Sequence, residues 1–308
     1  MTPLDRNTLD RHDFILMEAA IVERLRRESG VALHPELVNA PLVHEEPGRA
    51  AMARIYGEYL AIAAAAQLPM LILTPTWRAN RERIEAAGEA RDLNGDGVRF
   101  LRGLGAGREA GAPVWIGGQM GCRNDCYRPE EGLSATAAER FHAWQVERLA
   151  AAEPDFLLAA TLPAVTEATG IARAMARSGL PYLLSFVIGR DGRVLDGTPL
   201  ADAVAVIDAG VDAPPLGYQV NCSYPTFLDG VRQSPELSRR LIGFQANASA
   251  LDQAALDGAC ALQAEPVAEW GEAMLRLRRE RGLKLLGGCC GTGAAHLRYL
   301  VAHRRELP

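Results

Sequence analysis

The chain has few cysteines, no long hydrophobic run and no excess of positive charge. Six cysteines in 308 residues are too sparse for the disulfide framework of a small secreted scaffold. No apolar run approaches the roughly 20 residues of a membrane-spanning helix. The net charge of −5 argues against a nucleic-acid-binding surface. The first residues, MTPLDRNTLDRHD, do not resemble a secretory leader, so we expect a cytoplasmic protein with reduced thiols and no membrane contact.

Eight short apolar runs alternate with helix-like stretches along the chain. The runs begin at Phe14, Pro69, Val114, Phe156, Tyr182, Leu216, Leu241 and Leu283. Their continuous hydrophobicity is typical of parallel strands that are covered on both faces. This order predicts an α/β protein, a single-domain (βα)8 TIM barrel over residues 1–308. An open doubly wound sheet is the alternative, but the glycines from Gly103 to Gly107 lack the Rossmann spacing and are expected in a loop.

Three cysteines fall at the ends of two predicted strands. Cys222 ends the run from Leu216, and Cys289 and Cys290 end the run from Leu283 within GGCCGTG. A disulfide between adjacent cysteines closes a strained ring, whereas two thiolates on a glycine-rich turn can face one soft metal ion. Because barrel strands end on a common face, we expect the three sulfurs to bind Zn²⁺ with an open fourth position. Cysteines that are merely buried are the alternative.

These motifs resemble the two zinc motifs of the homocysteine S-methyltransferase family. The resemblance covers nearly the whole chain and rests on Val220–Cys222, Gly287–Thr292, TPTWRAN from Thr74, DGRVLDGTPLADAV from Asp191, and shorter matches at Ser185 and Asn247. It implies a zinc-dependent S-methyltransferase that methylates a small thiol such as homocysteine, as in methionine biosynthesis. The implied methyl donor is a sulfonium, a betaine-type ammonium, a folate or a methyl-corrinoid. A corrinoid protein would be the partner in the last case.

The expected substrate-binding positions match the family less well than the metal motifs do. Members that act on homocysteine carry two carboxylates for its ammonium group, whereas this chain has the longer Glu18 at one position and Ala160 at the other. The strand-end residues that we expect to bind substrate or support the site are Glu18, Thr161, Ser185, Asn221 and Asn247. Strand-end polar residues also cap barrel loops, so a purely structural role is the alternative for each.

Several further alternatives stay open. Trp77 and Tyr224 either stack on a cationic methyl donor or only close the barrel mouth. His296 is expected to pack or orient rather than to bind metal, and Cys122 and Cys126 have no assigned role. A zinc hydrolase is disfavoured because no H-E-x-x-H or carboxylate ligand pattern occurs. A non-catalytic thiol-binding or redox-sensing barrel is the other alternative, and the sequence leaves the oligomeric state open.

Overall fold

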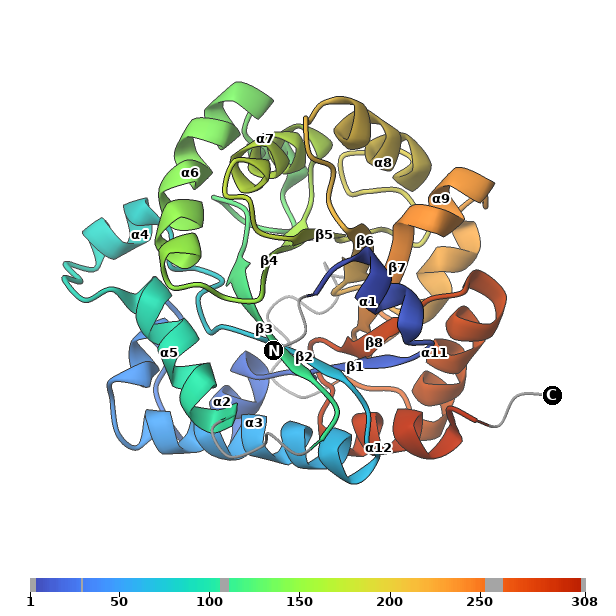
Figure 1. The fold of residues 1–308 in the computed structure, drawn as a ribbon, viewed down its shortest axis with the longest axis horizontal. Helices are drawn as coiled ribbons and strands as arrows, with labels where there is room; N and C mark the ends of the chain where they lie inside the picture. The colour runs from blue at the N-terminus through green and yellow to red at the C-terminus, as the bar shows by residue number, and fades with distance from the viewer. Residues whose placement is uncertain (1–3, 29, 106–110, 253–262, 306–308) are drawn as a thin grey trace.

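The protein folds into a closed barrel of eight parallel strands in the order β1 to β8, surrounded by helices (Figure 1). The computed structural model describes residues 4–28, 30–105, 111–252 and 263–305. The strands are β1 (Ile15–Met17), β2 (Met70–Leu73), β3 (Val114–Met120), β4 (Phe156–Leu162), β5 (Tyr182–Phe186), β6 (Gly217–Asn221), β7 (Leu241–Ala246) and β8 (Leu285–Gly288). The (βα)8 prediction is confirmed, and the closed strand order excludes the open doubly wound sheet.

The helices lie outside the strands, apart from the short α1 at one end of the barrel (Figure 1). They are α1 (Arg6–Arg11), α2 (Val22–Glu28), α3 (Gly48–Ala65), α4 (Arg81–Ala86), α5 (Leu93–Gly105), α6 (Ala135–Ala151), α7 (Val165–Ala176), α8 (Leu200–Ala209), α9 (Pro235–Arg240), α11 (Val267–Arg281) and α12 (Ala294–His303). None of the helices in the described part of the chain has the length and apolar character that a membrane span requires.

Two details differ from the sequence-based expectation. The run from Phe14 contains only a three-residue strand, so Glu18 lies beyond its carboxyl end. Gly103 and Gly105 belong to the end of α5 rather than to a loop. Buried apolar residues of this helix, such as Leu101, pack in the protein core and stabilise it up to these glycines. The rest of the predicted loop, residues 106–110, lies outside the described residues.

Hydrophobic side chains form two layers, one inside the barrel and one between strands and helices. The inner cluster consists of Leu4, Leu9, Ile15, Met17, Leu71, Leu73, Trp115, Phe156, Leu158, Ala160, Leu183 and Leu285. Packing inside the barrel is tight, because a Cβ at Gly117 would lie 2.5 Å from the Phe156 ring. Leu4 and Leu9 belong to α1 and the residues before it, so this segment closes the amino-terminal end of the barrel. The carboxyl ends of the strands are left to form the functional site.

Candidate metal centre

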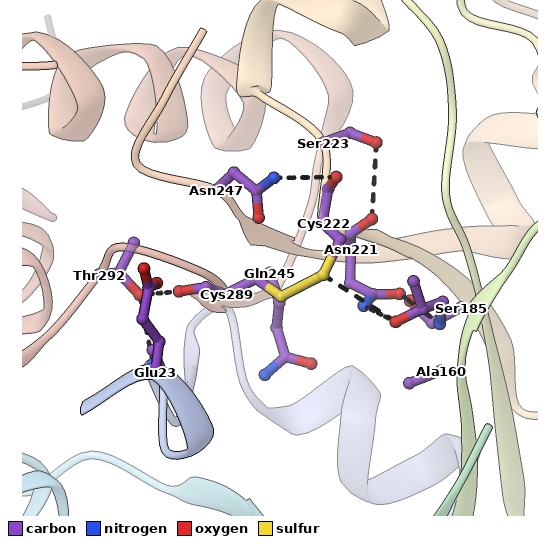
Figure 2. The surroundings of a disulfide bond; sticks show 12 residues. Glu23, Ala160, Ser185, Asn221, Cys222, Ser223, Gln245, Asn247, Cys289 and Thr292 are labelled. Carbon is purple, nitrogen blue, oxygen red and sulfur yellow. Dashed lines mark hydrogen bonds between the residues drawn. A yellow bond between two sulfur atoms is a disulfide. The ribbon is translucent and has the colours of Figure 1, made fainter. Parts of the chain in front are cut away.

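Three cysteine sulfurs meet at the carboxyl ends of β6 and β8. The Sγ atoms of Cys222, Cys289 and Cys290 lie within 4.8 Å of one another. Cys222 is buried, Cys289 is half-buried and Cys290 is exposed. A disulfide joins Cys222 to Cys289, whose Cα atoms are 5.6 Å apart, while Cys290 is free (Figure 2). The adjacent pair is thus not cross-linked, as expected, whereas the bond between Cys222 and Cys289 was not predicted from the sequence.

The three sulfurs fit a soft divalent metal ion once the disulfide is reduced. Three thiolates are a donor set that zinc accepts, and an arrangement with only three protein ligands leaves a position for substrate. The sulfurs border a cavity of about 620 Å³, so a small molecule can reach that position. In the described residues, no other group of His, Cys, Asp or Glu side chains comes together in this way. The predicted convergence of Cys222, Cys289 and Cys290 is therefore present.

Hydrogen bonds fix the turn that carries Cys289 and Cys290 against strand β7. The backbone N–H of Cys289 donates to the Ala246 carbonyl at 2.7 Å, and the Cys290 carbonyl accepts from the Ala248 N–H at 2.9 Å. The Thr292 hydroxyl donates to the Cys289 carbonyl at 2.6 Å. The two cysteines are therefore anchored to the neighbouring strand and to the start of the following helix, α12.

A left-handed backbone conformation directs Cys222 into the cavity. Successive side chains of a strand point to opposite faces; Val220 lies in the outer hydrophobic layer and Asn221 lines the cavity. A regular strand would thus turn the next side chain outward. Cys222 has φ of 52°, so the chain leaves the strand geometry there, and Asn221 and Cys222 both face the cavity.

Asn221 connects three strands beside Cys222. Its Oδ1 atom accepts from the Thr161 N–H at 2.8 Å and from the Ser185 hydroxyl at 2.6 Å. Its Nδ2 atom donates to Thr161 Oγ1 at 2.7 Å, and that hydroxyl lies 4.0 Å from Cys222 Sγ (Figure 2). Thr161, Ser185 and Asn221, all expected near substrate, therefore bind one another, and Ser185 is fully buried behind the cavity wall.

Asn247 and Glu18 line the cavity and keep atoms for further hydrogen bonds. Asn247 Nδ2 donates to the Cys222 carbonyl at 3.0 Å, and its buried Oδ1 has no partner among the described residues. Glu18 Oε2 accepts from the Leu73 N–H at 2.7 Å. Burial raises the pKa of Glu18 to about 8, so at neutral pH the carboxyl group is mainly protonated and can donate a hydrogen bond.

The aromatic residues and the histidine predicted near the mouth have distinct surroundings. Trp77 lines the cavity, and the Arg78 guanidinium lies 4.4 Å from the centre of its ring, so one cation already occupies that ring. Tyr224 is buried and does not line the cavity. His296 packs edge-on against Trp270 with ring centres 4.9 Å apart, and burial lowers the pKa of His296 to about 4. The histidine is not a member of the three-sulfur group.

The remaining cysteines follow strand β3 or lie outside the described residues. Cys122 and Cys126 are buried and free, and Cys126 lines the cavity. Burial raises the pKa of Cys122 to about 12, so this side chain is a thiol at neutral pH. Cys260 falls among residues 253–262, which the structure does not describe.

Glu23 is a cavity residue that the sequence analysis missed. It lies in the first turn of α2, and one of its carboxylate oxygens accepts a hydrogen bond from the Gly291 N–H, next to Cys290. Acidic residues are common in the first turn of a helix because they interact favourably with its dipole. The sequence therefore carried no signal that set this glutamate apart.

Comparison with known proteins assigns the chain to a family. Residues 15–303 match the family model described as Homocysteine S-methyltransferase. A homocysteine S-methyltransferase of Bacillus subtilis is 25% identical, with 100% of this chain and 99% of the relative covered. One of Escherichia coli is 27% identical, with coverage of 96% and 97%.

Solved structures of the E. coli homocysteine methyltransferase MmuM share the fold. Its metallated form has a TM-score of 0.75 at 23% identity, covering 97% of this chain and 99% of that one. Its oxidized form has a TM-score of 0.76 at 22% identity, covering 98% and 100%. Because the matching family model spans the whole barrel and all three clustered cysteines, the chain belongs to the homocysteine S-methyltransferase family and is a methyltransferase of that type.

Proposed function

We propose that the protein is a zinc-dependent S-methyltransferase that transfers a methyl group from an activated donor to a small thiol such as homocysteine. The proposal treats residues 1–308 as one catalytic domain in which Cys222, Cys289 and Cys290 are the metal ligands. The observation that carries it is the convergence of these three sulfurs on the wall of a cavity of about 620 Å³. The names of the relatives support homocysteine as the acceptor.

The reaction requires an acceptor sulfur that is ionised at neutral pH. A free thiol is mostly protonated there, since its pKa is about 8.5. When bound, zinc would take the place of that proton and keep the acceptor as a thiolate. The S–CH₃ bond then forms as the bond between the methyl group and the donor breaks, and the donor leaves with that electron pair. The proton of the thiol passes to solvent when the acceptor binds.

The residues around the cysteines divide into two groups by their hydrogen bonds. Thr161, Ser185 and Asn221 use their polar atoms on one another, so we assign them to holding Cys222 in position. Asn247 and Glu18 retain a carbonyl oxygen and a carboxyl group at the cavity wall. We assign these two to the polar part of the acceptor, where Asn247 accepts a hydrogen bond and Glu18 either donates one or binds a cation.

The donor is a sulfonium, a betaine-type ammonium, a folate or a methyl-corrinoid. A methyl-corrinoid would be brought by a partner protein. The ligand sulfurs must be reduced before they can bind metal, so we place the working enzyme in the cytoplasm, a reducing compartment.

Metal analysis combined with a donor screen tests the proposal. The reduced protein is loaded with zinc and assayed with homocysteine and other thiols against one donor or more of each class: S-methylmethionine, S-adenosylmethionine, betaine, methyltetrahydrofolate and methylcobalamin. We expect one zinc per chain and donor-dependent methylation, both lost in Cys289→Ser. Cys126→Ser is the matched control, because Cys126 lines the same cavity outside the three-sulfur group. A metal-free protein with full activity would contradict the proposal, and zinc binding without methylation by any donor would favour the non-catalytic thiol-binding barrel.

A further inference from the structure

We propose that Glu23 is a positioning residue for Cys290 and that Arg27 holds its carboxylate in place. The inference rests on the proposed function to the extent that Cys290 is taken as a metal ligand. The first turn of α2 would then influence how tightly the metal site binds its ion.

Both oxygens of Glu23 are engaged, one by the cysteine turn and one by its own helix. Oε2 accepts from the Gly291 N–H, and Oε1 accepts from Arg27 Nε at 3.0 Å. The Glu23 side chain is only 19% exposed, and Figure 2 shows it beside the turn that carries the cysteines. The guanidinium therefore holds the carboxylate in the orientation that reaches Gly291.

The peptide group between Cys290 and Gly291 is held at both of its polar atoms. Its carbonyl accepts from the Ala248 N–H at 2.9 Å, and its N–H donates to Glu23. Holding this peptide restrains ψ of Cys290 and φ of Gly291, and with them the path of the turn that carries the Cys290 side chain. Cys290 is the exposed member of the sulfur group, and these two hydrogen bonds restrain the backbone that positions its side chain.

The contacts of Glu23 distinguish a positioning residue from a metal ligand and from a helix cap. Glu23 is not part of the group whose atoms could hold a metal ion, and both of its oxygens already accept hydrogen bonds. A residue that only capped α2 would direct its carboxylate to an N–H group of that helix. Oε2 of Glu23 instead reaches a backbone N–H that is 268 positions away in the sequence.

Zinc titrations of the reduced protein against a competing chelator test the inference. Loss of a residue that orients a metal ligand lowers metal affinity by about 10- to 100-fold, so we expect this loss in Glu23→Ala. Glu23→Gln keeps an oxygen for the Gly291 N–H and should lose less. Glu85→Ala is the control for the loss of an i,i+4 ion pair on a helix, because Glu85 pairs with Arg81 on α4. We expect unchanged affinity there.

Cobalt provides a readout that does not depend on turnover. Charge-transfer absorption of Co²⁺ reports how many thiolates bind it, so Glu23→Ala should lower this band toward that of a two-thiolate site. Cys290→Ser supplies the reference spectrum. If Glu23→Ala fails to fold, as judged by its melting temperature without metal, Glu23→Gln and Arg27→Ala take its place, each with a smaller expected loss.

The outcomes for the inference and for the proposed function can be told apart. Unchanged zinc affinity and an unchanged cobalt spectrum in the Glu23 variants, with wild-type protein that binds zinc, would overturn the inference alone. Wild-type reduced protein that binds neither metal would instead remove the proposed function and the inference with it.

Discussion

Replacing Asn221 with alanine should destabilise the protein and weaken the metal site together. The Asn221 side chain is 5% exposed and makes three hydrogen bonds, to Thr161 N–H, Thr161 Oγ1 and the Ser185 hydroxyl. A buried donor left without an acceptor costs about 1–3 kcal/mol. The Ser185 hydroxyl can rotate toward another acceptor, but the Thr161 N–H cannot. We therefore expect the free energy of unfolding to fall by about 2–4 kcal/mol.

Urea denaturation of the reduced, metal-free protein measures this change, and chelator titration measures zinc affinity in the same samples. Ser185→Ala is the matched control, because it removes one of the three hydrogen bonds and leaves the contact between Asn221 and Thr161. Its expected loss is about 0.5–1.5 kcal/mol, with little change in zinc affinity. If Asn221→Ala cost no more than Ser185→Ala and bound zinc as tightly as wild type, the network would not be what positions Cys222.

Two further substitutions test groups inside and outside the cavity. The pKa of Glu18 is about 8 in the folded protein against an ordinary value of 4.5, so the folded state binds this proton more tightly. Its contribution to stability is complete below pH 4.5 and is lost as the pH rises to about 8, by at most about 1.4 kcal/mol per pH unit. Glu18→Gln should flatten this decline in urea denaturation at pH 5 and pH 8. His142→Ala removes the buried hydrogen bond in which Nε2 lies 2.8 Å from Glu167 Oε1, while Glu167 keeps its bonds from the N–H groups of Arg123 and Leu133. Urea denaturation should show a loss of about 1–3 kcal/mol, and zinc titration should show unchanged affinity, because the pair lies outside the cavity.

The barrel could be predicted because its strands are covered on both faces. Residues such as Leu157 and Leu158 belong to the outer and inner hydrophobic layers in turn, so each strand is a continuous apolar run. The same runs do not show where each strand ends, because buried apolar residues continue past it. Ala19, for example, is buried although it lies beyond β1. The meeting of Cys222 with the cysteine pair followed from topology alone, because the carboxyl ends of all the strands share one face.

Contacts between distant polar residues could not be predicted. Nothing near Glu23 in the sequence marks Gly291 as its partner, and the same holds for Asn221 and Thr161, which are 60 positions apart. The disulfide between Cys222 and Cys289 could not be predicted from the sequence either. A pattern that places three sulfurs together does not distinguish thiolates that share a metal from a pair that has been oxidised.

The polar network also explains how two strands depart from regular geometry at the site. Ala160 belongs to the inner layer, so alternation would turn Thr161 outward, yet Thr161 lines the cavity with φ of 60°. Cys222 breaks the alternation after β6 in the same way. Such backbone conformations cost about 1–3 kcal/mol for residues other than glycine and persist only where surrounding contacts enforce them. Asn221 binds the backbone N–H of Thr161, and Asn247 binds the carbonyl of Cys222. The strand-end amides therefore stabilise the two left-handed residues that bring the buried sulfur to the cavity, a role that requires no contact with substrate.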